Sequence, residues 1–330
     1  MDKRLYGTRL ALVATIAAWS AVSATVTHAQ SWPTVKAISV LNPAPAGGVL
    51  DNLLRSTSEI VAKRIGQSMV VESKSGGAGV PLAQVVALAP ADGYVIGANY
   101  ASYVINPIVM KSLPFDTARD FVPVTKLADL TLVWVAPTSA PYANIPELLK
   151  FARANPGKVS YGQPGMGGST HFSFESFRRT AAVSIELIPY RGEAQVVPDI
   201  LGERVGLALL SIGTAMPHVQ AGKMKVLAVM TEKRLPALPN VATISEGLPE
   251  FKALPTWYGL YMRAGTPQAV VDRLAAEYRH ALEDPAVKAR LEAAGLIPVG
   301  SSPAEFAAQI RKESGIYADL IRETGFKLEQ

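Results

Sequence analysis

ISVLNPAPAGGVLD, residues 38–51, joins a strand-like run to a helical pattern through a loop of proline, alanine and glycine. Gly47 and Gly48 allow the backbone of this loop to approach a ligand closely. The first turn of a helix has unpaired N–H groups and a positive dipole end, which favour a carboxylate or phosphate there without a basic side chain. The segment is therefore a candidate anion-binding loop. The alternative is an ordinary strand-to-helix turn in which Asp51 is a helix cap or a first-turn acid.

Strand-like and helical patterns alternate along most of the chain. In the first half, strand patterns lie at 37–41, 68–72 and 94–98, and helical patterns lie at 51–65 and 81–89. In the second half, helical patterns lie at 145–154, 171–179 and 194–201, and strand patterns lie at 158–162, 184–189 and 205–210. Such alternation predicts parallel sheets covered by helices.

The order of these patterns predicts two lobes. Strand-like segments at 130–136 and 226–230 are candidate crossings, because the proline-rich stretch 235–255 then leads into 257–262 and a helical tail. A chain of this length also exceeds the size that one hydrophobic core usually serves. We therefore expect an α/β protein of two lobes joined by a double hinge. Lobe 1 is expected at 30–130 plus 255–330, and lobe 2 at 131–254.

Composition excludes several classes of protein. The chain has 330 residues, 49% of them apolar, and no cysteine. The lack of cysteine rules out disulfides, thiolate metal sites, iron–sulfur clusters and cysteine nucleophiles. The formal net charge of +5 is spread along the chain without a basic run, which favours small anionic partners and gives no support for nucleic acid.

The first 29 residues have the pattern of a cleavable signal peptide. Lys3, Arg4 and Arg9 precede an apolar run at 10–18, and small residues surround Ala29. The competing interpretation is a retained membrane anchor, because no charged residue follows Arg9 until position 36. Polar residues limit the strongly apolar core to roughly 10 residues, short of a membrane span. We expect a soluble, non-lipidated periplasmic protein.

A second glycine-rich loop, GQPGMGGSTH at residues 162–171, also lies between a strand and a helical pattern. Ser169 or Thr170 can cap that helix and still contact a ligand. Because His171 lies beside Ser169, a periplasmic hydrolase is a remote alternative, but the G-x-S-x-G context of a nucleophilic serine is missing.

A third strand-to-helix junction is IPYRGEA, residues 188–194. Arg191 either clamps a carboxylate or lies solvated on the rim, and Tyr190 is either a wall of the site or a core residue. The histidines at 218 and 280 lack partners at metal-ligand spacing, and no dinucleotide or P-loop pattern occurs. We expect no catalytic residue, no metal and no cofactor.

Ligands in open α/β sheets bind beyond the carboxyl ends of the strands, where all three junctions lie. Two lobes that present these loops to each other would enclose an anionic ligand, and hinge closure would remove it from water. This arrangement is typical of a binding protein.

The chain resembles the solute receptors of tripartite tricarboxylate transporters, also called the Bordetella uptake gene family, over residues 33–329. The matching segments, in order, are PAGG at 45–48, VVES at 70–73, ADGY at 91–94, INP at 105–107, ANPGK at 154–158, GMGGSTH at 165–171, PYRG at 189–192, AGK at 221–223, LPNV at 238–241, WYGL at 257–260 and AGTP at 264–267.

This resemblance implies a type II periplasmic binding protein fold, with ligand carboxylates held between the first and second loops, partly by backbone N–H groups and water. The implied ligand-binding residues are Ala46, Gly47, Gly48, Asp51, Gly167, Gly168, Ser169, Thr170 and His171. Ser102 and Asn106 are further candidates. The third junction adds Tyr190 and Arg191 to these candidates. The implied function is capture of a small carboxylate and delivery to membrane transporter subunits by a monomeric receptor. The alternative output is signalling through a membrane sensor kinase.

Two positions depart from the family. Family members usually carry an aromatic residue near Asn42 or Pro43, and a threonine where this chain has Leu50. Loss of one neutral hydrogen bond is worth roughly 0.5–1.5 kcal/mol, so binding survives but the ligand's identity is open. Leu50 either lies at the rim, which would favour an acid with an apolar body, or packs into the helix interface.

Overall fold

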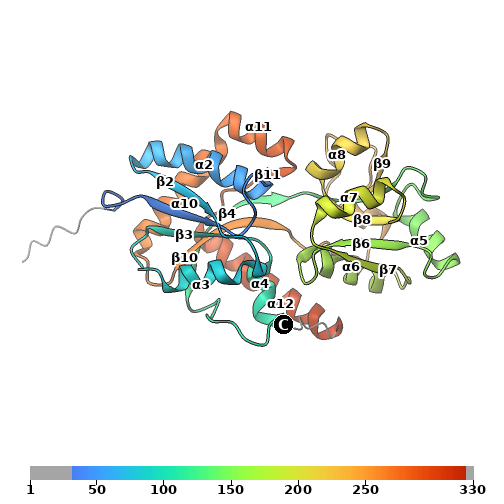
Figure 1. Cartoon of the computed structure of the whole chain (residues 1–330), viewed down its shortest axis with the longest axis horizontal. Coiled ribbons are helices and arrows are strands. Elements are labelled where there is room, and N and C mark those ends of the chain that lie inside the picture. Colours follow the sequence, from blue (N-terminus) through green and yellow to red (C-terminus); the bar gives the residue numbers. More distant parts are fainter. Residues whose placement is uncertain (1–31, 325–330) are drawn as a thin grey trace, which may run out of the picture.

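The structure is a computed structural model that describes residues 32–324 of the chain. Two separate sheets are its framework, and helices cover the faces of both (Figure 1). The first sheet has the strand order β11-β4-β10-β3-β1-β2, and the second has the order β7-β6-β8-β5-β9. The predicted signal peptide lies outside the described residues. Within residues 32–324, no helix is both long enough and apolar enough to cross a membrane.

The six-stranded sheet combines parallel and antiparallel strands. β1 pairs in parallel with β2 and β3, whereas β10 runs antiparallel between β3 and β4. The strands are β1 (Ile38–Asn42), β2 (Met69–Ser73), β3 (Val95–Asn99), β4 (Phe121–Leu130), β10 (Trp257–Arg263) and β11 (Leu296–Pro298). The first three strands thus end at one edge of the sheet, at the residues that begin β10.

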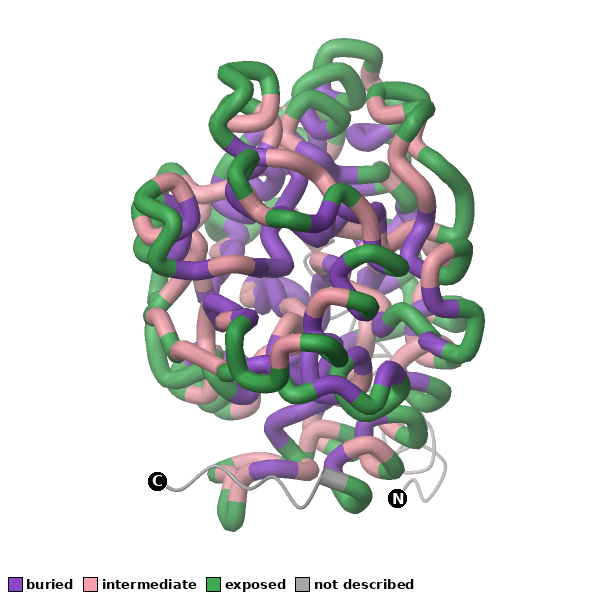
Figure 2. The backbone as a smooth tube through the Cα atoms, turned by 90° about the vertical axis from the view of Figure 1, so that its right-hand side faces the viewer, coloured by how far each residue is buried: buried purple, intermediate pink, exposed green. Residues whose placement is uncertain are grey.

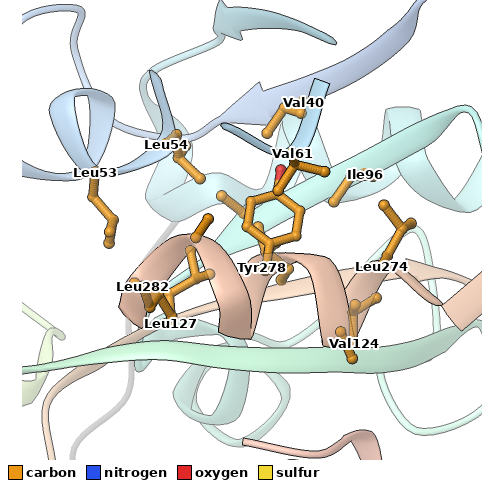
Figure 3. Packing of buried hydrophobic residues seen from close by; sticks show 14 of the residues in the cluster. Val40, Leu53, Leu54, Val61, Ile96, Val124, Leu127, Leu274, Tyr278 and Leu282 are labelled. Carbon is orange, nitrogen blue, oxygen red and sulfur yellow. The ribbon is translucent and has the colours of Figure 1, made fainter. Parts of the chain in front are cut away.

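Helices bury both faces of this sheet. On one face, α2 and α10 contribute Leu53, Leu54, Leu274 and Tyr278 to a buried cluster that also contains Val40 of β1 (Figure 3). α2 ends where Gly66 adopts the left-handed conformation that commonly terminates helices. The helices are α2 (Val49–Ile65), the short 3-10 helix η1 (Gly77–Gly79), α3 (Val80–Leu88), α4 (Ser102–Val109), α10 (Gln268–Glu283), α11 (Pro285–Ala293) and α12 (Pro303–Thr324).

The five-stranded sheet has its own aromatic core. The rings of Tyr161 and Phe174 stack with centroids 3.9 Å apart, and the rings of Trp134 and Phe177 lie 4.6 Å apart, all four side chains being fully buried. The elements are β5 (Leu132–Pro137), α5 (Ile145–Ala154), β6 (Ser160–Pro164), α6 (Ser169–Thr180), β7 (Glu186–Tyr190), α7 (Glu193–Leu201), β8 (Leu207–Ser211), α8 (Ile212–Gln220), β9 (Met224–Val229) and α9 (Ile244–Gly247). β5 and β8 are buried along their whole length. Figure 2 shows buried segments inside the molecule and exposed segments at its periphery.

The chain passes between the sheets twice, as the sequence predicts. The first passage is the short step from β4 to β5, and the second is the long segment from β9 to β10. The two passages touch, because Leu130 N donates to Thr256 O at 2.8 Å. α12 also contacts both parts: it packs on β4 and α4, and its Tyr317 ring lies 6.1 Å from the ring of Phe172 in α6.

Candidate functional site

The loop between β1 and α2 presents an uncapped helix N-terminus. Gly48 is the N-cap of α2, its backbone is extended, and no side chain accepts a hydrogen bond from the first turn. Gly47 has a φ of +78°, which a residue with a side chain adopts only with strain. Ala46 and Gly47 are exposed. The N-terminus of α2 therefore lies directly after exposed loop residues, and its positive dipole end favours an anion there.

Asp51 holds this loop from inside. Its carboxylate accepts hydrogen bonds from Gly47 N at 2.9 Å, Arg55 Nε at 2.8 Å and Asn42 Nδ2 at 3.1 Å, and the residue is only 2% exposed. The Arg55 guanidinium is the main cause of a lowered pKa for this carboxyl group, and the bonds from Gly47 and Asn42 add to it. Both oxygens of Asp51 are thus engaged by the protein.

The supporting role of Asn42 is not predicted from the sequence, in which the residue is only a departure from the family. Asn42 is completely buried; its Nδ2 contacts Asp51 and also donates to Ser73 Oγ at 3.3 Å, and its Oδ1 accepts from Ala44 N at 2.9 Å. The amide therefore connects the ends of β1 and β2 to the loop. The only signal in the sequence is the unusual residue at position 42, whose role depends on a partner nine positions away.

The second loop also ends in an uncapped helix, which corrects the expected role of two hydroxyl residues. Gly168 is the N-cap of α6, and no side chain caps the helix, so neither Ser169 nor Thr170 is the cap. Thr170 Oγ1 instead accepts from Gln163 Nε2 at 2.9 Å. The reason is that the backbone enters the helix one residue earlier than the hydroxyls suggest, with Gly168 extended at φ −89° and ψ 177°.

His171 lies inside the second loop. It is 3% exposed, and its Nδ1 accepts a hydrogen bond from Gly167 N at 3.3 Å, which requires that nitrogen to be unprotonated. Burial lowers the pKa of His171. The imidazole thus fixes the path of the Gly167 backbone, a contact that parallels the one between Asp51 and Gly47 in the first loop.

At the third junction, Tyr190 packs against the protein and Arg191 is exposed to solvent. Tyr190 is half-buried, and its hydroxyl donates to Asp199 Oδ2 at 2.6 Å. Burial and this carboxylate raise the pKa of Tyr190 to about 12. Arg191 is exposed, and its backbone N–H donates to Gln195 Oε1 at 3.0 Å. Arg191 thus lies exposed two residues before the start of α7.

Ser102 and Asn106 lie on α4, behind the edge where β3 ends. Both are buried, at 9% and 6% exposed, and Asn106 Nδ2 donates to Ala78 O at 3.0 Å. They lie beside Pro43 of the first loop, around one small cavity. These two residues are therefore further from solvent than the glycine loops.

One contact places the two glycine loops at the same edge. Thr256 is the residue before β10, and its Oγ1 donates to Ser169 Oγ at 3.4 Å. In the antiparallel pair of β10 and β3, Gly259 lies opposite Asn99, the last residue of β3. The N-terminus of α6 therefore lies at the edge of the six-stranded sheet where β1 and β3 end, which is the edge that carries the first loop.

Leu50 packs into the helix interface, with 2% exposed, in the cluster that contains Leu53 and Tyr278. Of the two interpretations of this position, the structure selects core packing. Leu50 therefore carries no information on the body of the ligand.

Known proteins are similar to this chain in sequence and in fold. The profile described as tripartite tricarboxylate transporter family receptor matches residues 53–326. A UPF0065 protein from the tcbD-tcbE intergenic region of Pseudomonas sp. (strain P51) is 36% identical over 283 residues, which cover 85% of this chain and 84% of that protein. Rpa4515 of R. palustris, solved with adipate, has a TM-score of 0.80 at 29% identity, over 90% of this chain and 99% of that one. MatC (Rpa3494) from Rhodopseudomonas palustris, with bound malate, has a TM-score of 0.75 at 25% identity, over 87% and 99%.

These likenesses confirm the predicted periplasmic binding protein fold with its two α/β parts. The match includes both passages between the sheets and every strand except β1, which precedes residue 53 together with the first loop. The chain belongs to the tripartite tricarboxylate transporter receptor family.

Proposed function

We propose that this protein is a periplasmic receptor that captures a small carboxylate between two lobes and delivers it to the membrane subunits of a tripartite transporter. The observation that carries the proposal is the pair of uncapped helix N-termini, at Gly48 and Gly168, at one sheet edge. Relatives solved with adipate and with malate bind ligands of this chemistry. A dicarboxylate of similar length is the ligand class that we infer.

In this proposal, backbone groups supply most of the recognition. The first-turn N–H groups of α2 and α6 bind one carboxylate, with Ala46, Gly47, Gly167, Gly168, Ser169 and Thr170 around it. Arg191 is available for the second carboxylate, because it is exposed at the start of α7. Asp51 and His171 position the loops without touching the ligand, since both are engaged with loop N–H groups.

The proposal includes the lobe boundaries, 30–130 plus 255–330 and 131–254, and closure about the two passages between the sheets. It also includes cleavage of a signal peptide near Ala29 and action as a monomer. Signalling through the periplasmic domain of a sensor kinase uses the same binding event and differs only in the partner of the closed form.

Hydrolysis has less support. A serine nucleophile needs a general base within hydrogen-bond reach. His171 Nδ1 is occupied by Gly167 N, and Ser169 Oγ contacts Thr256. The described contacts thus direct the two side chains to different partners.

Ligand release is the first experiment. Residues 30–330 are expressed and purified, the protein is gently unfolded, and released small molecules are identified by mass spectrometry. If none is found, adipate, malate and longer or aromatic acids are added in thermal melts. At a hundredfold excess over Kd, binding should stabilise the protein by about 2.7 kcal/mol. No shift with any acid contradicts the proposal.

Gly168→Val then tests the second loop. The backbone of Gly168 suits any residue, and an added Cβ would meet only Gly165 O, at 3.8 Å. We expect the melt without ligand to stay nearly unchanged and the shift with acid to disappear, because the side chain covers the first-turn N–H groups. Gly315→Val in α12 is the matched control, since Gly315 is exposed and an added Cβ there meets nothing within 4 Å. Retained binding in the Gly168 variant excludes the second loop from the site.

A further inference from the structure

A small cavity lies between β3, β10, η1 and α4. Its volume is about 20 Å³. Its polar wall consists of Asn99, Ser102, Asn106 and Thr117, and the rings of Tyr103 and Tyr261 line it as well. A cavity that holds one water needs roughly 10–15 Å³, so this space accepts a single group of that size.

Asn99 is the unusual member of the wall. It is 5% exposed, and among the described residues neither its Nδ2 nor its Oδ1 has a hydrogen-bond partner. Asn106, in the same wall, has its Nδ2 engaged by Ala78 O. Buried amide groups in native proteins are nearly always hydrogen-bonded, because an unpaired one loses its hydration without compensation. Asn99 thus lines the cavity, and both the donor and the acceptor of its amide lack partners among the described residues.

Glycines keep this space open. Gly79 has a φ of +81°, and an added Cβ would lie 3.6 Å from Pro43 Cβ and 4.0 Å from Ser102 Oγ. An added Cβ on Gly97 would lie 2.5 Å from Cζ of Tyr261. A side chain at position 97 would therefore displace the Tyr261 ring, and one at position 79 would strain the backbone and narrow the space.

We propose that this cavity is a binding site for one water-sized group that both donates and accepts hydrogen bonds, with Asn99 as its principal partner. Two sources supply such a group. One is solvent water. The other is the hydroxyl of an acid bound at the first loop, because Pro43 of that loop also lines the cavity. Only the second source rests on the proposed function.

Asn99→Leu tests the site, with Asn106→Leu as the matched control that removes an amide with a known partner. Melts without ligand are measured first, followed by titrations with adipate and malate. If water fills the cavity, Asn99→Leu lowers Tm by at least about 2 °C, as Asn106→Leu does. If an acid's hydroxyl fills it, Tm is unchanged or higher and the affinity for malate falls about tenfold, while that for adipate, which has no hydroxyl, is kept.

An unchanged or raised Tm together with unchanged affinities overturns the proposal, since replacing unpaired buried polar atoms by an apolar side chain is neutral or stabilising. If neither acid binds the wild-type protein, the melts alone decide. If Asn99→Leu does not fold, high-resolution crystals of the wild-type protein with and without acid replace it. Density within about 3.2 Å of the Asn99 amide in either crystal supports the site, and an empty cavity in both refutes it.

Discussion

Asp51→Asn should weaken ligand binding, although Asp51 faces the protein. Its Oδ2 accepts from Gly47 N and Arg55 Nε, and its Oδ1 accepts from Asn42 Nδ2. An asparagine has one acceptor oxygen in place of two. If the oxygen of the new asparagine points toward Asn42, its NH2 group faces the Gly47 and Arg55 donors. With the opposite orientation, it faces the NH2 group of Asn42.

The second orientation costs less, because Gly47 N and Arg55 Nε keep their acceptor. Oδ1 loses the bonds from Asn42 Nδ2 and from Ser73 Oγ, which donates to it at 3.4 Å, but Asn42 keeps its own contact with Ser73. Leaving one buried donor without its acceptor costs about 1–3 kcal/mol, and exchanging a charged acceptor for a neutral one weakens the Gly47 bond further. If this cost falls on the binding-competent loop, affinity falls between about fivefold and about 150-fold. The freed positive charge of Arg55 works against this loss, but the Arg55 side chain is half-exposed, so its effect stays within about 1 kcal/mol.

The assay is calorimetric titration of Asp51→Asn with the bound acid, at low salt and at about 1 M salt, where the Debye length of about 3 Å suppresses the effect of Arg55. Glu59→Gln is the matched control: it makes the same chemical change on α2, at an exposed pair with Lys63. We expect the control to bind like the wild-type protein. Equal affinity of Asp51→Asn and Glu59→Gln at high salt would refute the reasoning.

Three other changes test the charges around the site. Arg55→Gln should lower affinity by a few-fold at low salt, because it leaves the Asp51 carboxylate uncompensated beside the anion. It should also lower Tm without ligand at neutral pH, because Arg55 is the main cause of the lowered pKa of the buried Asp51. Unchanged binding in low-salt titrations contradicts the first expectation. Burial lowers the pKa of His171 in the folded protein, so as the pH falls this histidine is protonated in the unfolded chain before it is protonated in the folded one. The free energy of unfolding should therefore fall as the pH drops below about 6.5. Denaturant melts at pH 7.5 and 5.5 should show this loss in the wild-type protein and a smaller one in His171→Asn. Burial raises the pKa of Glu313, whose carboxylate accepts from Trp257 Nε1 at 2.7 Å, so its ionisation destabilises the fold increasingly above pH 4.5. Glu313→Gln should therefore be at least as stable as the wild-type protein at pH 7, with the difference vanishing near pH 4; a large loss at pH 7 would show that the charge is needed.

The sequence predicts the elements well because their signals are local. The helix expected at 51–65 is α2 at Val49–Ile65, and the strand expected at 184–189 is β7 at Glu186–Tyr190. The periodicity of apolar residues and the glycines at element ends are enough for such assignments. The two passages between the sheets follow from the order of the patterns, since a proline-rich stretch separates β9 from β10.

The site is predicted less completely because its contacts join distant residues. Position 168 is the N-cap of α6, although three adjacent residues, Gly168, Ser169 and Thr170, are all suitable caps by type. Leu50 is a core residue because of helix α10, which begins more than 200 positions later. The unpaired amide of Asn99 depends on the packing of η1, α4 and β10 around it, and nothing in its sequence neighbours indicates a cavity.

Both glycine loops are built in the same way. In each, a buried side chain four residues downstream accepts a hydrogen bond from a left-handed glycine: Asp51 from Gly47, and His171 from Gly167. Each bond fixes the residue just before the N-cap, so the first-turn N–H groups are set before a ligand arrives, and less conformational entropy is lost on binding. The charge of Asp51 is offset by Arg55, and burial keeps His171 largely neutral at pH 7, so neither loop presents a net side-chain charge of its own. Selectivity for an anion at these loops must then come from the helix N-termini, and selectivity among anions from the residues that line the space between them.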